Sequence, residues 1–155
     1  MPQSPSILFV CLGNICRSPL AEGAFRAAAQ AAGLDVAADS AGTGDWHVGR
    51  PPDTRAQAVA RAHGVDISGL RARQVTAEDF HRFTHVFALD PANLADLAAI
   101  RPADATADLG LLMDVVPGRK GSAVDDPYYG DAAGFEATWA DVTAAAARLV
   151  DRFGG

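Results

Sequence analysis

Cysteine is scarce in this sequence, and basic residues are outnumbered. The two cysteines, at positions 11 and 16, do not form the distributed framework that staples small secreted domains. Lysine and arginine total 13 against 19 acidic residues, for a formal net charge of -6. Nucleic acids and acidic membrane surfaces attract proteins with a basic footprint. The composition therefore argues against both as main partners, and the cysteine usage favours a reducing compartment, which predicts a cytoplasmic protein.

Long apolar runs are missing as well. No apolar stretch approaches the roughly 20 residues that a membrane helix requires. The first apolar run begins within about six residues of Met1, and we expect no charged leader and apolar signal segment before it. With 155 residues, of which 49% are hydrophobic, the chain is typical of one globular domain, and we assign residues 1–155 to that domain.

The most informative segment present is CLGNICRS, at residues 11–18. It follows the all-apolar run 7–10, which is typical of a buried strand. It precedes Ser18 and Pro19, which predict a helix N-cap and a first helical position. The backbone N-H groups of a turn between strand and helix, together with the helix dipole, favour an anion at one point. Cys11 is placed at that point.

Strands and helices alternate along the rest of the chain. Further strands are predicted near 36–40, 85–89 and 108–113. Helices are predicted over about 19–32 and from Asp53 to His63, and a capping box formed by Thr76 and Asp79 predicts a further short helix. A closing helix carries an apolar stripe at Phe135, Trp139, Val142, Ala146, Leu149 and Phe153. This order predicts an α/β fold with a four-stranded parallel sheet, helices on both faces and a phosphate-binding loop after the first strand.

The residue types in the turn suit nucleophilic chemistry on a phosphate. A cysteine is a useful nucleophile as the thiolate, which a helix N-terminus, a nearby cation and N-H donors all favour at Cys11. Arg17 presents a planar fork that can bind two phosphoryl oxygens at once. Gly13 permits close backbone approach, and Asn14 tolerates a left-handed conformation. The hydroxyl of Ser18 can either cap the helix or donate to the sulfur.

Displacing an alcohol or phenol from phosphorus also requires an acid for the leaving oxygen and a base for water. The loop sequence DDPYYG offers Asp125 and Asp126, and spacing alone leaves both open. Tyr128, Tyr129 and the distant Trp46 can wall a cleft, since aromatic faces hold a flat ring by stacking. The four histidines form no clustered ligand pattern, so no metal and no other cofactor is expected.

Taken together, the segments CLGNICRSP, DSAGTGDWHVGRPPD, RARQ with TAEDF, LDPANL and DPYYG resemble the low-molecular-weight protein tyrosine phosphatase family along nearly the whole chain. The resemblance implies a hydrolase of aryl phosphate monoesters, above all phosphotyrosine on proteins. It implies Cys11 as the nucleophile that becomes phosphocysteine, Arg17 as part of the phosphate cradle, and Asp126 as general acid and then base. It also implies loop support from Ser40 and a substrate-binding set of Leu12, Gly13, Asn14, Ile15, Cys16, Ser18, Trp46 and Tyr128.

Two positions within the resemblance have particular consequences. Leu70 stands where family members often carry a histidine that helps hold the loop asparagine. Cys16 matches a second loop cysteine that in the family can form a reversible disulfide with the nucleophile. On spacing alone, a buried inert thiol at Cys16 is an equal alternative. Exposed Trp46 and Tyr128 are compatible with a monomer or a weak homo-oligomer.

Two other functions share this loop. A thiol-dependent arsenate reductase passes a disulfide among several cysteines, but the chain has no cysteine after Cys16. A non-catalytic module that binds phosphate or a phosphopeptide would use the same cradle with Cys11 protonated. The rate at which Cys11 is alkylated at pH 6 distinguishes such a module from an enzyme, because a neutral thiol reacts slowly.

Overall fold

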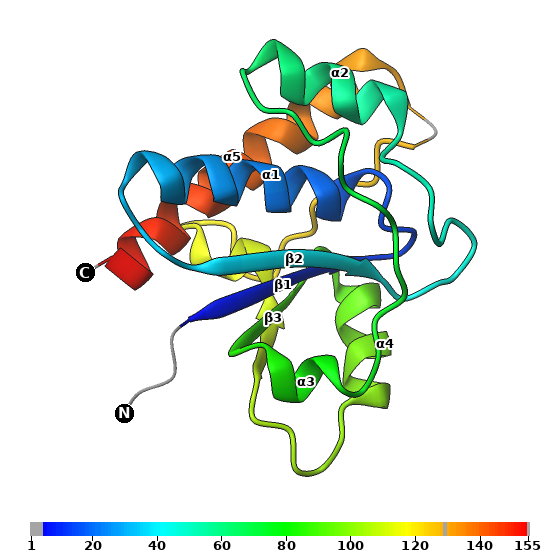
Figure 1. Ribbon diagram of the computed structural model, residues 1–155, viewed down its shortest axis with the longest axis vertical. Coiled ribbons are helices and arrows are strands. Elements are labelled where there is room, and N and C mark those ends of the chain that lie inside the picture. The colour runs from blue at the N-terminus through cyan, green and yellow to red at the C-terminus, as the bar shows by residue number, and fades with distance from the viewer. Residues whose placement is uncertain (1–4, 129, 155) are drawn as a thin grey trace.

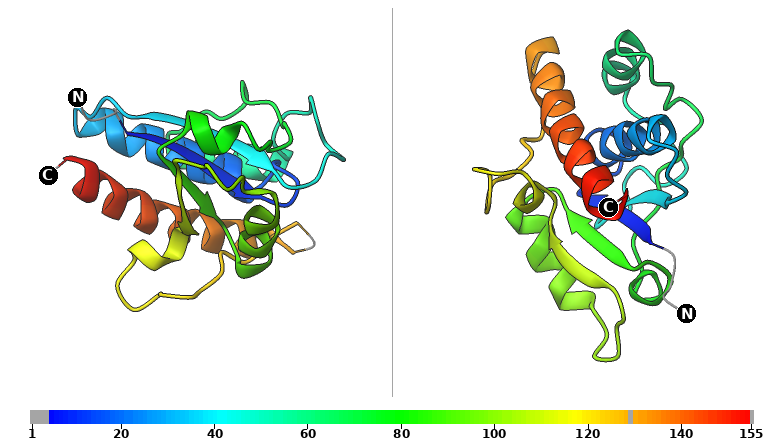
Figure 2. Two further views of the ribbon diagram at one scale, coloured as in Figure 1. Left: turned by 90° about the horizontal axis from the view of Figure 1, so that it is seen from below. Right: turned by 90° about the vertical axis from the view of Figure 1, so that its left-hand side faces the viewer.

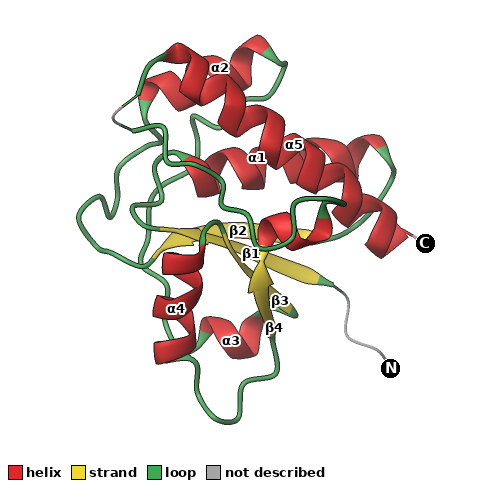
Figure 3. Ribbon diagram, turned by 180° about the vertical axis from the view of Figure 1, so that it is seen from behind, coloured by secondary structure: helices red, strands yellow, loops and turns green. Residues whose placement is uncertain are grey.

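The computed structural model describes residues 5–128 and 130–154. Its centre is a four-stranded parallel sheet, as predicted, and the strand order is β2-β1-β3-β4 (Figures 1 and 3). The strands are β1 (Ser6–Cys11), β2 (Ala37–Gly42), β3 (His85–Ala88) and β4 (Asp108–Leu111). Since all four run in the same direction, their carboxyl ends share one edge of the sheet, and β1 delivers Cys11 to that edge.

Helices cover both faces of the sheet (Figures 1 and 3). The helices α1 (Arg17–Ala31) and α5 (Ala132–Gly154) lie side by side against one face, and α2 (Thr54–Ala62) packs onto them (Figure 2). The short α3 (Asp79–Arg82) and α4 (Pro91–Ile100) lie against the other face. No helix in the described part of the chain is long and apolar enough to cross a bilayer.

The central strand β1 feeds both cores. Successive side chains of a strand point to opposite faces. Ile7, Phe9 and Cys11 accordingly belong to the core under α1 and α5, while Leu8 and Val10 belong to the core under α3 and α4. A strand buried on both faces must be apolar throughout, which is why the run 7–10 has no polar position. The same alternation turns Cys11 toward α1.

Several predicted elements are confirmed. Asp53 caps α2 through a side chain that accepts a hydrogen bond from Arg55 N at 2.8 Å. The predicted stripe of α5 is buried at Phe135, Trp139, Val142, Ala146 and Leu149, and Phe153 is partly buried. Burial of this stripe, more than helix propensity, fixes α5 across α1.

The start of α1 differs from the prediction. The helix begins at Arg17, with Cys16 in the N-cap position and no side-chain cap. Ser18 therefore does not cap the helix, and its hydroxyl lies 3.0 Å from the sulfur of Cys11 instead. The physical reason is that Ser18 lies within the first turn of α1, where its hydroxyl contacts Cys11, Asn14 Nδ2 and the carbonyl oxygen of Ala41.

Two elements of the second half of the chain were not predicted at their positions. No helix is predicted between the third and fourth strands, yet α4 fills this stretch, with Pro91 at its start and Asp90 as its cap. Asp-Pro before an apolar run is a helix-start signal. The end of the predicted fourth strand is wrong too, because the chain turns at Leu112 into a short 3-10 helix, η1 (Leu112–Val115).

Candidate active site

The turn between β1 and α1 wraps around the sulfur of Cys11. The backbone N-H of Asn14 donates to this sulfur at 3.3 Å, and the hydroxyl of Ser18 lies 3.0 Å from it. Cys11 is buried, with 3% of its surface exposed. Hydrogen bonds of this kind stabilise a negative charge on sulfur. The buried sulfur therefore lies at the edge of the core, where it faces the polar groups of the turn and lines the cavity above it.

The carbonyl groups of the turn are held on its outer side. Leu12 O accepts from Gly44 N at 2.9 Å, and Ile15 O accepts from Asp53 N at 2.8 Å. In a planar trans peptide the N-H points opposite to the C=O, so the amide after each of these carbonyls is turned inward. Loops after β2 thus orient the amides that face the sulfur.

Asn14 gives the turn its sharp bend. Its φ of 58° is in the left-handed region, which asparagine tolerates better than most residues. Its side chain donates to Ser18 Oγ at 2.8 Å and accepts from the backbone N-H of Arg73 at 3.0 Å. Leu70 is partly buried against the core. Asn14 is therefore held by the backbone of Arg73 in a chain that has no histidine at position 70.

Close packing of β2 against the turn requires glycine at position 42. A Cβ atom on Gly42 would lie 2.8 Å from Leu12 O and 3.2 Å from Asn14 N. Both atoms belong to the backbone of the turn, so a side chain there would displace the turn itself. The end of β2 is thus a direct support of the anion-binding backbone.

Arg17 lies at the base of the site and is 3% exposed. Its Nη1 donates to Asp90 Oδ2 at 2.6 Å and to the carbonyl oxygen of Val124 at 3.1 Å. Burial acts to lower the pKa of Arg17, but the charges of Cys11, Asp90 and Asp126 outweigh it and hold the pKa above its ordinary value. The guanidinium is a permanent, oriented cation beside the sulfur.

Asp90 is a site residue that the sequence reasoning missed. Its Oδ1 accepts from Asn93 N at 2.7 Å and caps α4, while its Oδ2 binds Arg17. One carboxylate therefore starts a helix and orients the arginine. The Asp-Pro pair was visible in the sequence, but its second task depends on β3 lying beside β1.

The structure separates the two candidate acids. Asp126 Oδ2 lies 3.7 Å from Arg17 Nη2, and its side chain is 41% exposed at the mouth of the site. Its Oδ1 accepts from Tyr128 N at 3.1 Å. Asp125 is exposed and is not part of the cavity lining, and its carbonyl oxygen accepts from Thr138 on α5. Only Asp126 of this pair is brought to the cavity.

A cavity of about 420 Å³ opens above the sulfur. Its lining combines the turn with aromatic side chains and one acid: Cys11, Leu12, Gly13, Ile15, Cys16, Arg17, Trp46, His47, Asp126 and Tyr128. The rings of His47 and Tyr128 lie 6.5 Å apart between centroids. His47 lines the cavity, whereas the sequence alone showed only that the four histidines form no metal-ligand pattern. Tyr129 lies outside the described residues.

Cys16 lies in the same turn as a free, buried thiol. Burial, followed by the charges of Asp53 and Cys11, raises the pKa of Cys16 far above its ordinary value. This thiol is neutral at physiological pH, so it does not compete with Cys11 as a nucleophile.

Ser40 acts one layer below the turn. Its hydroxyl donates to Glu22 Oε1 at 2.8 Å, and Arg26 Nε donates to Glu22 Oε2 at 2.7 Å. Burial raises the pKa of Glu22 above its ordinary value although both hydrogen bonds oppose it. These contacts fasten α1 to β2, and the helix in turn places Arg17.

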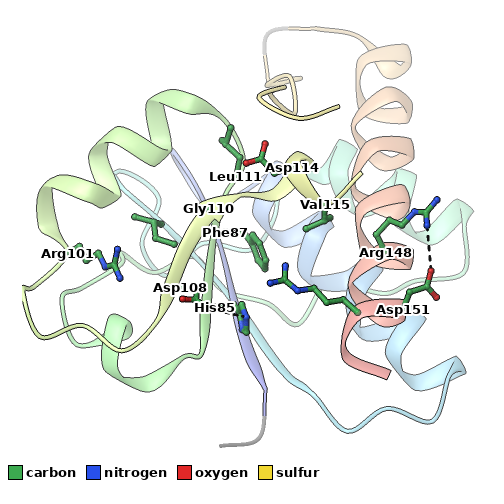
Figure 4. Close-up of a pocket in the computed structure, with 12 residues that line it drawn as sticks. His85, Phe87, Arg101, Asp108, Gly110, Leu111, Asp114, Val115, Arg148 and Asp151 are labelled. Atoms are coloured by element: carbon green, nitrogen blue, oxygen red, sulfur yellow. Dashed lines mark ion pairs between the residues drawn. The ribbon is translucent and has the colours of Figure 1, made fainter. Parts of the chain in front are cut away.

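A larger hollow of about 750 Å³ lies away from this site, between the edge strand β4 and the last turns of α5 (Figure 4). Its polar lining includes His85, Asp108, Arg148 and Asp151, and it contains no cysteine. Among residues 5–128 and 130–154, no cluster of three metal-ligating side chains is found.

Comparison with known proteins places the chain among relatives of matching size. The family model described as low molecular weight phosphotyrosine protein phosphatase matches residues 6–154. The phosphatase of that name from Schizosaccharomyces pombe is 41% identical over 138 residues, covering 87% of this chain and 88% of the relative. The low molecular weight protein-tyrosine-phosphatase YfkJ from Bacillus subtilis is 43% identical over 126 residues, covering 80% and 81%.

A solved structure agrees with these relatives. The crystal structure of a protein tyrosine phosphatase from Entamoeba histolytica with Hepes in its active site superposes with a TM-score of 0.91. The two sequences are 33% identical, and the match covers 97% of each chain. The similarity therefore extends over the sheet, both helical layers and the loops around Cys11.

Proposed function

Because the chain belongs to the low molecular weight phosphotyrosine protein phosphatase family, it is a protein tyrosine phosphatase, and we propose that Cys11 is its nucleophile. The observation that carries the proposal is the setting of one sulfur atom. It receives the amide of Asn14, lies 3.0 Å from the Ser18 hydroxyl and shares its cavity with Arg17. We take residues 1–155 as one catalytic domain and expect it in the cytoplasm.

In the first step, the Cys11 thiolate attacks phosphorus in line with the leaving oxygen. The S-P bond forms as the P-O bond to the aryl group breaks, and the protonated Asp126 gives its proton to the departing oxygen. Negative charge spread over the three equatorial oxygens is stabilised by the inward amides of residues 12–17 and by Arg17. Asp90 keeps the guanidinium directed at these oxygens as a positioning residue.

In the second step, the Asp126 carboxylate takes a proton from water as that water attacks phosphorus. The O-P bond forms, the S-P bond breaks, and the electron pair returns to sulfur as the thiolate. Inorganic phosphate leaves and Asp126 is again protonated. Over the two steps, one aryl phosphate and one water become one phenol and one inorganic phosphate.

Phosphotyrosine on proteins is the substrate class that the lining favours. Ile15, Trp46 and Tyr128 surround the cavity with apolar and aromatic surface, which holds a phenyl ring by stacking and burial. A phosphoserine side chain has no ring to stack against these walls. Aryl phosphates are therefore expected to be hydrolysed and phosphoserine peptides to be poor substrates.

Hydrolysis of an aryl phosphate in the presence of a chelator tests the proposal. The wild type is expected to remain active, and Cys11→Ser is expected to lose activity by at least about a thousandfold while it still binds inorganic phosphate. Phosphate binding by the variant is the control for folding of the turn. Near-normal turnover by Cys11→Ser would remove Cys11 from the reaction. Thiol-coupled reduction of arsenate would instead favour the reductase alternative.

A further inference from the structure

A groove beside the active-site cavity takes no part in the chemistry proposed above. It has a volume of about 390 Å³ and lies between the loop after β2 and the last turn of α4. Leu12 and Trp46 line both the groove and the cavity above Cys11, so the two hollows share a wall. On its far side the groove is bounded by Ile100, with Asp96 among its polar lining residues.

Exposed apolar side chains gather at this groove. Four large hydrophobic side chains are exposed in the described part of the chain, and three of them line it: Leu12 at 42%, Trp46 at 67% and Ile100 at 42%. The fourth, Val48 at 55%, does not. Single exposed apolar residues are ordinary, but a contiguous set next to a catalytic cavity indicates a binding surface.

The shared wall is held in place by the backbone beneath it. A Cβ atom on Gly44 would lie 1.9 Å from Trp46 Cζ3, so the indole rests directly on this glycine. Gly44 N in turn donates to Leu12 O at 2.9 Å. The two residues that separate the hollows are therefore supported by one hydrogen-bonded pair of loops, and the groove is present before any substrate binds.

We propose that this groove is a subsite for an apolar side chain close to the phosphotyrosine of a protein substrate. The inference rests on the proposed function. A peptide with its phosphotyrosine in the cavity must pass over the rim formed by Leu12 and Trp46, and an extended chain advances about 3.3 Å per residue. A residue within about three positions of the phosphotyrosine therefore reaches the groove.

The observations favour a substrate side chain as the occupant. The groove is continuous with the cavity through Leu12 and Trp46, and its volume is at the small end of ligand sites, which span about 300–1,000 Å³. Burying an apolar side chain against Ile100 and Trp46 removes surface of both partners from water. The carboxylate of Asp96 repels an acidic residue at the same position. The subsite thus selects apolar over polar or acidic neighbours.

The test compares phosphotyrosine peptides that carry one leucine, serine or glutamate at each of the three positions on either side. At one of these six positions, kcat/KM of the wild type is expected to be about tenfold higher with leucine than with serine, a difference of about 1.4 kcal/mol in transition-state binding. Ile100→Ser is expected to reduce this ratio to about twofold. Val48→Ser, an exposed apolar residue outside the groove, is the matched control and should keep the full ratio.

Aryl phosphate without a peptide should be hydrolysed equally by wild type, Ile100→Ser and Val48→Ser. If the wild type does not hydrolyse the aryl phosphate, the proposed function is contradicted. If it hydrolyses the aryl phosphate and the peptides but shows no preference for leucine, only the subsite is overturned. The ratio of the Kd values of the serine and leucine peptides for Cys11→Ser tests the subsite independently of turnover. A leucine preference that Ile100→Ser retains would also overturn it, and a changed oligomeric state in that variant with an unchanged preference would assign the groove to a second copy of the chain.

Discussion

Asp90 both caps α4 and forms an ion pair with Arg17, and two substitutions distinguish these roles. Alanine removes both interactions, whereas asparagine removes the ion pair and keeps a capping oxygen. In Asp90→Ala, α4 loses its N-cap, which costs about 1 kcal/mol of folding free energy. Arg17, 3% exposed, also loses its 2.6 Å carboxylate partner. Breaking a buried ion pair costs about 3–5 kcal/mol. The side chain of Asp90 is 21% exposed, so we take the lower end, about 3 kcal/mol, for the pair.

These magnitudes predict a loss of about 4 kcal/mol for Asp90→Ala and about 3 kcal/mol for Asp90→Asn, which keeps a capping oxygen for Asn93 N. Urea unfolding, with the slope m checked for each variant, measures both values. The measurement is made without phosphate, because phosphate bound to the native turn would add stability.

Both variants should also lower kcat/KM for an aryl phosphate, because Arg17 is no longer held by a charged partner. The two substitutions should lower kcat/KM to a similar extent, while their free energies of unfolding should differ by the contribution of the N-cap, about 1 kcal/mol. Equal stability of the two variants would refute the capping role of Asp90. Unchanged kcat/KM in both would refute its role in orienting Arg17.

Three further outcomes are expected. Asp126→Asn should slow hydrolysis by roughly 10²–10⁴-fold for aryl phosphates with poor leaving groups and much less for good ones, and an equal loss across a leaving-group series would contradict its acid role. Gly42→Ala should lower the free energy of unfolding by about 1–3 kcal/mol and weaken phosphate binding, because its Cβ would lie 2.8 Å from Leu12 O. Unchanged phosphate affinity by calorimetry would refute the role of Gly42 in supporting the turn. Burial raises the pKa of Glu22, so folding favours its protonated form, and the free energy of unfolding of the wild type should fall as pH rises from the ordinary glutamate pKa through the raised one. Glu22→Gln should not show this fall. Urea unfolding from pH 4 to 7 measures it, and the same pH dependence of the unfolding free energy in both proteins would contradict the prediction.

Local signals were enough to predict the elements that form from neighbouring residues. The apolar run 7–10 predicted a strand buried on both faces, and the structure divides it between two cores. Asp53 predicted the start of α2 because a cap needs only its own helix. The stripe that includes Phe135 and Trp139 predicted the buried face of α5 for the same reason.

Features that depend on contacts between distant segments were not predictable in this way. Asp90 meets Arg17 only because β3 pairs with β1, and 73 residues separate the two in sequence. His47 reaches the cavity through a loop whose path is set by hydrogen bonds to the turn, such as Gly44 N to Leu12 O. The start of α1 at Arg17 was misplaced because Ser18 has the composition of a cap, while its hydroxyl is directed to Cys11.

Trapping the covalent intermediate tests the central claim most directly. In Asp126→Ala, an aryl phosphate with a good leaving group still phosphorylates Cys11, because this step then needs no acid. Hydrolysis of the phosphocysteine lacks the Asp126 base, so the intermediate should accumulate. Rapid quenching followed by mass spectrometry of the peptide that contains residues 7–17 should find one phosphoryl group on Cys11. A phosphoryl group on any other residue, or continued turnover with Cys11 unmodified at every time point, would contradict the account.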